Sequence, residues 1–184
     1  MYKEVTKEQM KQLLDYIDRK QPQYYGVTYM AMRLGWRREQ IISLKRGNIK
    51  VNGFRPVEIV CEAEDTKNKE PFVLRNIDDE LSKVIQRYLW DGRDTPWLFP
   101  SKRNQKIHSN HYTAFISKVS EKIIGIRVTP HDFRHNFCTQ RLREGAVERD
   151  IMAITGHKDP ESFRIYVHAT SEGTRQVLSR SKLF

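Results

Sequence analysis

The sequence predicts a mainly α-helical domain that carries one small antiparallel β-sheet. Most of the chain spaces its apolar residues three and four positions apart, as amphipathic helices do. A short central stretch changes to alternation at Val57, Ile59 and Cys61, which is typical of a strand with one buried face. The length of 184 residues suits one domain, and we expect residues 1–184 to form it.

Three helices are expected before the sheet. Thr6 has the side chain of an N-cap, and a polar turn at residues 20–22 ends the first helix. Gly35 ends the second helix, and the third ends before Gly47. Their buried faces are marked by Met10, Leu13, Leu14, Ile17, Tyr24, Val27, Met30, Ala31, Leu34, Ile41, Ile42 and Leu44.

The sheet has two or three strands in this interpretation. The alternating stretch at residues 57–61 and the apolar run at residues 72–74 are strands, and the polar residues 62–70 connect them as a hairpin. Pro56 and Pro71 suit strand starts or edges, because proline has no backbone N–H to donate.

Helices resume after the sheet. Asp78 or Asp79 caps the next one, and the apolar residues 97–100 anchor the loop that follows it. Thr129 and Pro130 are the residue types preferred at the N-cap and the first position of a later helix. The other expected helices are one that contains Tyr112, Phe115, Ile116, Val119 and Ile123, a short one from Val147 to Ile154 ended by Gly156, and one that starts at Pro160.

The composition favours a polyanionic partner and excludes several classes of protein. Lys and Arg total 33 against 23 acidic residues, and neutralising phosphates with such a surface releases counterions. A basic protein without a nucleic-acid partner stays open on charge alone. No apolar run approaches the ~18 residues of a membrane span, and the N-terminus does not resemble a signal peptide. Cys61 and Cys138 have no CxxC spacing and are expected to be reduced core thiols of a cytoplasmic protein.

Two segments near the C-terminal end carry reactive side chains. His131 and Arg134 are three residues apart and share a helix face, and Tyr166 follows His157 by nine residues. A phenol is a weak nucleophile at its ordinary pKa of ~10 and needs cations and proton acceptors beside it. Residues 131–135 also resemble the HExxH motif of zinc proteases, but aspartate replaces the general-base glutamate, and we expect no metal or other cofactor.

Residues 129–166 resemble box II of the tyrosine recombinases, the phage integrase family. The family pattern is a histidine, an arginine three positions on, a later Gly-His pair and a tyrosine nine residues after it. This chain shows that pattern at His131, Arg134, His157 and Tyr166. The resemblance covers the chain from about Val5 to about Ser171 and implies the catalytic-domain fold of that family.

Box I of the family, a Gly-x-Arg followed by an apolar helix, resembles residues 34–44. The match places a catalytic arginine at Arg37, with Gln40 where many members have glutamate. The family also uses a lysine in a turn between two strands. Lys67 suits that position by its strand phase, and Lys69 stays open as the alternative.

The resemblance implies a metal-free and ATP-free transesterification on double-stranded DNA. Tyr166 would attack the scissile phosphate to form a 3′-phosphotyrosyl bond, while Arg37 and Arg134 hold the non-bridging oxygens. His131 would accept the phenolic proton or position the phosphate. In the same scheme His157 donates a hydrogen bond to the phosphate and Lys67 protonates the leaving 5′-oxygen.

The resemblance also implies partners and limits. We expect double-stranded DNA and other protomers, in a tetrameric synapse on DNA, as partners, and no membrane. The family's N-terminal core-binding domain has no counterpart in these residues, and the tail at residues 167–184 is a candidate for packing on a neighbouring protomer. A type IB topoisomerase and a DNA-binding regulator without activity are the alternatives. Further DNA contacts are expected from Arg38, Lys45, Lys69, Lys102, Arg103, Lys106 and His135.

Each residue also has a purely structural interpretation when it is taken alone. Arg37 could be a surface helix arginine, Tyr166 an aromatic side chain that covers the core, and Lys67 a solvated turn residue. His135 alone is best interpreted as a packed histidine bonded to backbone. The catalytic interpretation depends on these residues coming together in space.

Overall fold

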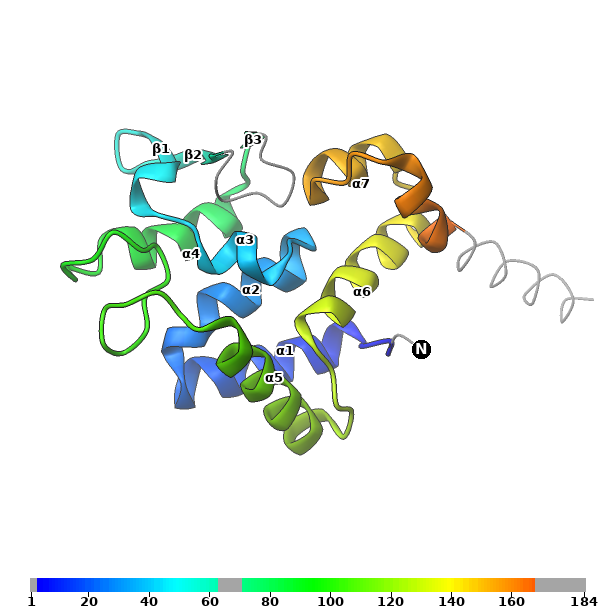
Figure 1. Ribbon diagram of the computed structural model, residues 1–184, viewed down its shortest axis with the longest axis horizontal. Coiled ribbons are helices and arrows are strands. Elements are labelled where there is room, and N and C mark those ends of the chain that lie inside the picture. The colour runs from blue at the N-terminus through cyan, green and yellow to red at the C-terminus, as the bar shows by residue number, and fades with distance from the viewer. Residues whose placement is uncertain (1–2, 63–70, 168–184) are drawn as a thin grey trace, which may run out of the picture.

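The protein folds as a set of helices with a small sheet at one edge (Figure 1), in a computed structural model that describes residues 3–62 and 71–167. The sheet lies along the top of the view above α3 and α4, and α6 and α7 lie at the right. The α-helices are α1 (Lys7–Lys20), α2 (Tyr25–Leu34), α3 (Arg38–Ile42), α4 (Asp79–Leu89), α5 (Ser109–Ile124), α6 (Pro130–Arg143) and α7 (Glu148–Thr155), and a further helix begins at residue 160. Two 3₁₀ turns occupy Pro22–Tyr24 and Arg46–Asn48, and the strands are β1 (Ile49–Asn52), β2 (Arg55–Cys61) and β3 (Phe72–Arg75).

The expected helix starts are confirmed by their caps. The Thr6 hydroxyl accepts from the backbone N–H of Gln9 at 3.1 Å, and the Gln9 side chain accepts from the Thr6 N–H at 3.0 Å. Of the two candidates for the cap of α4, Asp78 is the one that caps it. Thr129 and Asp132 form a second reciprocal capping box at the start of α6.

The expectation that the third helix includes Leu44 is wrong. Helix α3 ends at Ile42, and the chain then turns into an extended bridge between Lys45 and Trp97. Leu44 is nevertheless buried, and its carbonyl accepts from the N–H of Leu98 at 2.8 Å. Leu44 therefore lies in a loop although its spacing is helical. This loop is held by its contact with the apolar residues 97–100.

The sheet is antiparallel, with the strand order β1-β2-β3. Ile59 in the middle strand pairs with Ile49 on one side and with Leu74 on the other, and its side chain is fully buried. Pro56 lies opposite a register irregularity between Lys50 and Val51, a position where a missing N–H is tolerated. The predicted connection at residues 62–70 falls almost wholly outside the described residues.

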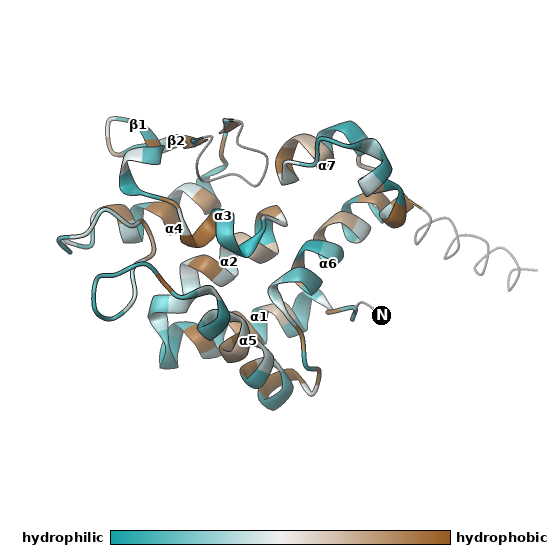
Figure 2. Ribbon diagram, viewed as in Figure 1, coloured by the Kyte–Doolittle hydropathy of each residue, from teal (hydrophilic) through white to brown (hydrophobic). Residues whose placement is uncertain are grey.

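Two apolar clusters form the interior. The larger one surrounds α2 and includes the fully buried side chains of Trp36, Phe99 and Tyr112. The smaller one joins α6, α7 and the helix that begins at residue 160. Figure 2 shows apolar segments on α2, and polar stretches interrupted by apolar ones on the loop between α4 and α5. The second cluster contains Phe137, Cys138, Ile151, Phe163 and Tyr166.

Both cysteines are buried in the core, as expected. Within residues 3–62 and 71–167, no helix combines the length and the apolar character needed to cross a membrane.

Candidate active site

Arg134 is the centre of a buried polar cluster. Its side chain lies on the second turn of α6, and only 2% of the residue is exposed. The Nη1 group donates to the carbonyl oxygens of Gly35 at 2.8 Å and Thr155 at 2.9 Å. The Nη2 group lies 2.9 Å from Nε2 of His157. One guanidinium thus brings together the two sequence segments that box I and box II predicted to be neighbours.

These contacts follow from the geometry of helix ends. The last carbonyls of a helix have no partner within the helix, and Gly35 and Thr155 are at the C-terminal ends of α2 and α7. Burial lowers the pKa of Arg134 below its ordinary value, and the charge of Arg37 lowers it further. A guanidinium stays protonated in proteins, so Arg134 is a fixed buried cation.

His157 lies directly after the glycine that ends α7. Its residue is 9% exposed, and Nδ1 lies 2.6 Å from the Thr155 hydroxyl oxygen. Burial first, and the positive charge of Arg134 second, lower the pKa of His157 to about 3. This imidazole is therefore neutral at physiological pH.

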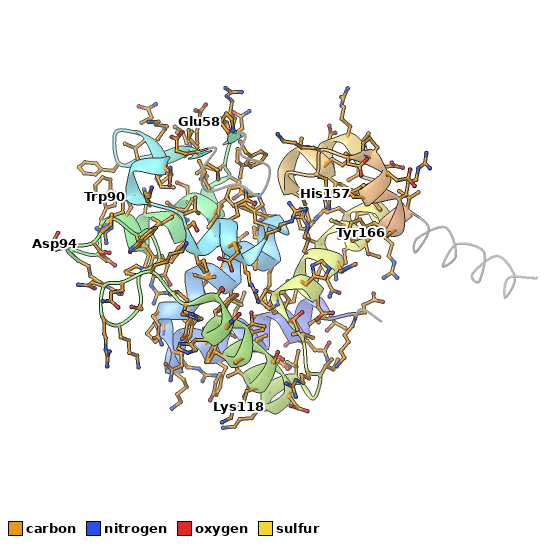
Figure 3. All side chains as sticks on the ribbon, viewed as in Figure 1. Glu58, Trp90, Asp94, Lys118, His157 and Tyr166 are labelled. Atoms are coloured by element: carbon orange, nitrogen blue, oxygen red, sulfur yellow. The ribbon has the colours of Figure 1, made fainter. Side chains whose placement is uncertain are left out.

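Tyr166 lies in the helix that begins at residue 160 and packs beside the same cluster (Figure 3). The residue is 3% exposed, and its ring centroid lies 5.6 Å from that of His157 and 5.0 Å from that of His135. Burial raises the pKa of Tyr166, and a hydrogen bond and the charge from Arg134 oppose that rise. The phenol is thus held next to a cation but is covered in this conformation.

His131 and His135 are adjacent on α6. Their Nε2 atoms are 3.0 Å apart, which requires one ring nitrogen to donate and the other to accept. Burial is the main cause that lowers the pKa of both. The His135 ring thus bonds to another side chain, and its expected bond to backbone stays a prediction. His135 therefore links the ring of Tyr166 to His131, whose side chain reaches solvent.

Arg37 is exposed at the N-cap of α3. The backbone before it is fixed by Trp36, which is fully buried and donates from Nε1 to the Ile154 carbonyl at 2.7 Å. The charge of Arg37 lowers the pKa of His131, Arg134, His157 and Tyr166, so it faces the same cluster. Among the described residues its guanidinium has no hydrogen bond or ion pair.

Five of the six predicted catalytic residues are therefore near one another. The sixth, Lys67, lies outside the described residues, as does its alternative Lys69. The structure does not describe residues 168–184, which include most of the tail predicted to pack on another protomer.

Apart from Lys69 and His135, the predicted DNA-contact residues divide into two groups. Lys102, Arg103 and Lys106 are exposed on the loop between α4 and α5, and Lys106 also donates to the Ser43 hydroxyl at 2.7 Å. Arg38 and Lys45 are half-buried. Arg38 donates to the Thr113 hydroxyl at 2.6 Å, so part of its fork is occupied within the protein.

The histidine pair does not form a zinc-protease site with Asp132. That carboxylate accepts from the N–H and the hydroxyl of Thr129, at 2.8 and 2.7 Å, and serves as a helix cap. Within the described part of the chain, no group of three or more metal-ligating side chains is present.

Two site residues were missed by reasoning from the sequence, Thr155 and Trp36. Thr155 bonds to His157, and Trp36 bonds to the carbonyl of Ile154, the residue before Thr155. Neither hydrogen bond can be predicted from residue spacing. The signal for Thr155 is a hydroxyl residue in the last turn of a helix, two positions before a histidine. For Trp36 the signal is an indole, which needs an acceptor when it is buried, between the glycine and the arginine of box I.

The comparisons with known proteins agree with this arrangement. Residues 3–172 match the model of the phage integrase family. Tyrosine recombinase XerA of Thermococcus kodakarensis is 25% identical over 181 residues, which cover 98% of this chain and 63% of that protein. The XerA of Pyrococcus horikoshii is 33% identical over 103 residues, which cover 54% of this chain and 36% of that protein. The chain thus spans less than two thirds of these relatives.

Solved structures show the same fold. A crystal structure of XerA recombinase matches with a TM-score of 0.76 at 22% identity, and covers 100% of this chain and 65% of that chain. A structure of XerH recombinase bound to a palindromic difH substrate matches with a TM-score of 0.68 at 15% identity, over 96% of this chain and 52% of that chain. The family model extends from the first cap of the fold past Tyr166, and this chain belongs to the phage integrase family.

Proposed function

We propose that this chain is the catalytic domain of a site-specific DNA recombinase that cleaves and rejoins strands through Tyr166. The observation that carries the proposal is the buried cluster in which the Tyr166 phenol lies beside the Arg134 guanidinium and the His157 imidazole. Relatives of the chain are named tyrosine recombinases, and several structures of the same fold hold DNA. Double-stranded DNA is therefore the proposed substrate.

The proposed reaction exchanges one phosphodiester for another. The Tyr166 oxygen forms a bond to phosphorus, the bond to the 5′-oxygen breaks, and the protein is left on the 3′ end. The phenolic proton passes to His131, and Lys67 supplies a proton to the 5′-oxygen. Attack by a 5′-hydroxyl from a second duplex reverses these transfers, so religation needs neither ATP nor metal.

The two arginines have different parts in this scheme. A guanidinium has five N–H donors, and Arg134 uses three of them on Gly35, Thr155 and His157. The two that remain are available to the phenol and to a phosphate oxygen. Arg37 is free to close on the phosphate from the solvent side, and the charge-assisted bonds stabilise the transition state.

Tyr166 has to move before it can react. A phenol that is 3% exposed cannot reach a phosphate of a duplex in this conformation. Phe163 and Tyr166 are the buried residues in the described part of this helix, and we infer that a shift of the helix exposes the nucleophile.

The remaining parts of the proposal concern the assembly. We infer that other protomers pair with this one on DNA, because an exchange between two duplexes needs two nucleophiles at a time. We also infer that the protein acts in the cytoplasm, where its substrate is found, and that residues 1–184 form the catalytic part of the recombinase.

The test uses a duplex with a nick close to the cleavage point. After cleavage the short fragment with the 5′-hydroxyl dissociates, religation is prevented, and the covalent adduct accumulates. Wild-type protein is expected to give an adduct that survives denaturation, and Tyr166→Phe to give none. Tyr16→Phe is the matched control, since Tyr16 lies on α1 beside Lys122, and it should behave as wild type. Adduct formed by Tyr166→Phe would refute the proposal.

A second assay separates recombination from simple nicking and closing. Two duplexes with different flanks should exchange them in a recombinase, whereas relaxation of a supercoiled plasmid without exchange would identify a topoisomerase-like enzyme. Excess chelator should leave either activity unchanged, because no proposed step uses a metal.

A further inference from the structure

The hydrogen bonds around His157 leave no freedom in where its proton lies. The Arg134 guanidinium can only donate, so at 2.9 Å the Nε2 atom of His157 must present its lone pair. The neutral ring then carries its proton on Nδ1. Nδ1 lies 2.6 Å from the Thr155 hydroxyl oxygen, which therefore accepts this proton.

The Thr155 hydroxyl is free to accept because its own proton is directed elsewhere. Its oxygen lies 2.8 Å from the carbonyl of Ile151, one helical turn earlier, and a carbonyl can only accept. Thr155 and Ile151 are 0% and 1% exposed, so water does not compete for these groups. The order of donation is Arg134 to His157, His157 to Thr155, and Thr155 to Ile151.

This order conflicts with the role that the catalytic scheme gives to His157. A ring whose Nε2 accepts from Arg134 cannot also donate from Nε2 to a phosphate. Donation requires the proton on Nε2 and a donor facing Nδ1 instead. Among the groups that contact Nδ1, the Thr155 hydroxyl can become that donor, because a hydroxyl both donates and accepts.

We propose that Thr155 is a positioning residue that stabilises one tautomer of His157 together with Arg134 when no DNA is bound, and the other tautomer when a phosphate is bound. Without DNA it accepts from Nδ1, which keeps Nε2 as an acceptor that orients Arg134. When Arg134 turns its Nη2 donor from His157 to a bound phosphate, Nδ1 releases its proton to water and Nε2 takes one up from water, so the net charge of the ring does not change. The hydroxyl then turns from the Ile151 carbonyl to donate to Nδ1, and His157 donates from Nε2 to the phosphate. The Ile151 carbonyl then loses its hydrogen bond from the Thr155 hydroxyl but keeps the backbone hydrogen bond of α7.

The part of this proposal that concerns the DNA-bound site rests on the proposed function. The part that concerns the site without DNA does not. The test compares wild type with Thr155→Val, which replaces the hydroxyl by a methyl group, and with Thr155→Ser, which keeps it. Long-range proton–nitrogen NMR of protein labelled at histidine distinguishes protonated from bare ring nitrogens. Wild type and Thr155→Ser should show His157 protonated at Nδ1, and Thr155→Val should gain a population protonated at Nε2.

Single-turnover cleavage of the nicked duplex tests the role of Thr155 when DNA is bound. Thr155→Val should form adduct about fivefold or more slowly, as for the loss of one hydrogen bond in the transition state. Thr155→Ser should restore most of the rate. Thr139→Val is the matched control, because Thr139 is a buried threonine of α6 whose hydroxyl has no partner within the described residues. It should change neither readout.

Two results would overturn the inference. One is wild-type His157 protonated at Nε2 without DNA, a measurement that needs no variant and does not depend on how Thr155→Val folds. The other is a Thr155→Val protein that matches wild type in both tautomer and cleavage rate. If wild type forms no adduct on any duplex, the proposed function fails. The NMR measurement still shows which nitrogen of His157 is protonated without DNA.

Discussion

Arg134 has two tasks in one side chain. It satisfies the carbonyls that end α2 and α7, and it keeps donors for the phenol and the phosphate. Arg37 has only the second task, because it is exposed and is not bonded within the described structure. The two arginines of the proposed mechanism should therefore differ in their effect on stability.

Arg134→Lys and Arg37→Lys test this difference. An ammonium group has no planar fork, so each variant is expected to slow cleavage by ~100-fold or more. Only Arg134→Lys should also lower the free energy of unfolding, by about 2 kcal/mol, because buried carbonyls lose their donors. Urea unfolding and single-turnover cleavage measure the two effects. Equal stability of both variants would contradict the structural task of Arg134.

The buried histidine makes stability depend on pH. The pKa of His157 is about 3 in the folded protein, below the ordinary ~6.5 of an unfolded chain. The unfolded chain therefore binds more protons between these two values. The stabilisation is fully present above ~6.5 and is lost as the pH falls towards the folded value. His131 and His135, whose pKa values are also lowered, act in the same direction.

Unfolding measured in urea at several pH values checks this dependence. Between pH ~7.5 and ~5.5 the free energy of unfolding should fall by about 1 kcal/mol from His157 alone. His157→Gln should flatten the curve, because the substitution removes the group whose pKa is lowered by burial. A wild-type protein that gains stability on acidification over this range would exclude a neutral buried His157.

Among the elements, the ends of helices matter most to the site. Gly35 ends α2 at a φ of 62°, and a Cβ placed there would lie 2.7 Å from Cδ1 of Phe137 on α6. The carbonyl of this glycine accepts from Arg134. Close packing of α2 on α6 therefore sets the position of box I relative to box II.

Gly35→Ala should disturb the site and the fold together. Gly125 ends α5 at a φ of 70°, and a Cβ added there would meet no atom within 4 Å, so Gly125→Ala isolates the backbone strain. We expect about 1 kcal/mol of destabilisation at Gly125 and about 2–4 kcal/mol at Gly35, where overpacking is added. Cleavage should slow only in Gly35→Ala. Equal effects in the two variants would show that the contact with Phe137 is unimportant.

The same element ends show what the sequence could and could not predict. Local chemistry identified the caps at Thr6, Asp78 and Thr129, because a cap acts within a few residues of itself. The end of α3 was misplaced, since Leu44 has helical spacing but is held by a bridge to the distant segment around Trp97. Long-range pairing of this kind leaves no periodic trace in the sequence.

The candidate site also has a part that the sequence predicted and a part that it did not. The resemblance to box I and box II identified Arg37, His131, Arg134, His157 and Tyr166, which the fold brings together. Spacing carried no information on the direction of the bonds within the cluster, on the contribution of Thr155, or on the burial of the phenol. These depend on how three helices meet.

For the whole molecule, the net charge of +10 is expected to dominate DNA binding. About four phosphate contacts would reduce affinity ~100-fold between ~50 and ~200 mM salt. Lys102→Gln, on the exposed loop before α5, should make the log–log salt slope shallower by about one. Lys118→Gln, on α5 and outside the proposed contacts, is the control (Figure 3). A flat salt dependence of the wild type would contradict binding through the DNA backbone.

The central claim is that one phenol oxygen becomes esterified to a DNA phosphate. The most direct measurement is mass spectrometry of peptides from protein trapped on a nicked duplex. The peptide that contains Tyr166 should carry the added nucleotide mass, with the site of attachment at that tyrosine. Nucleotide on any other residue, or on no residue while strands are still cut, would contradict the account.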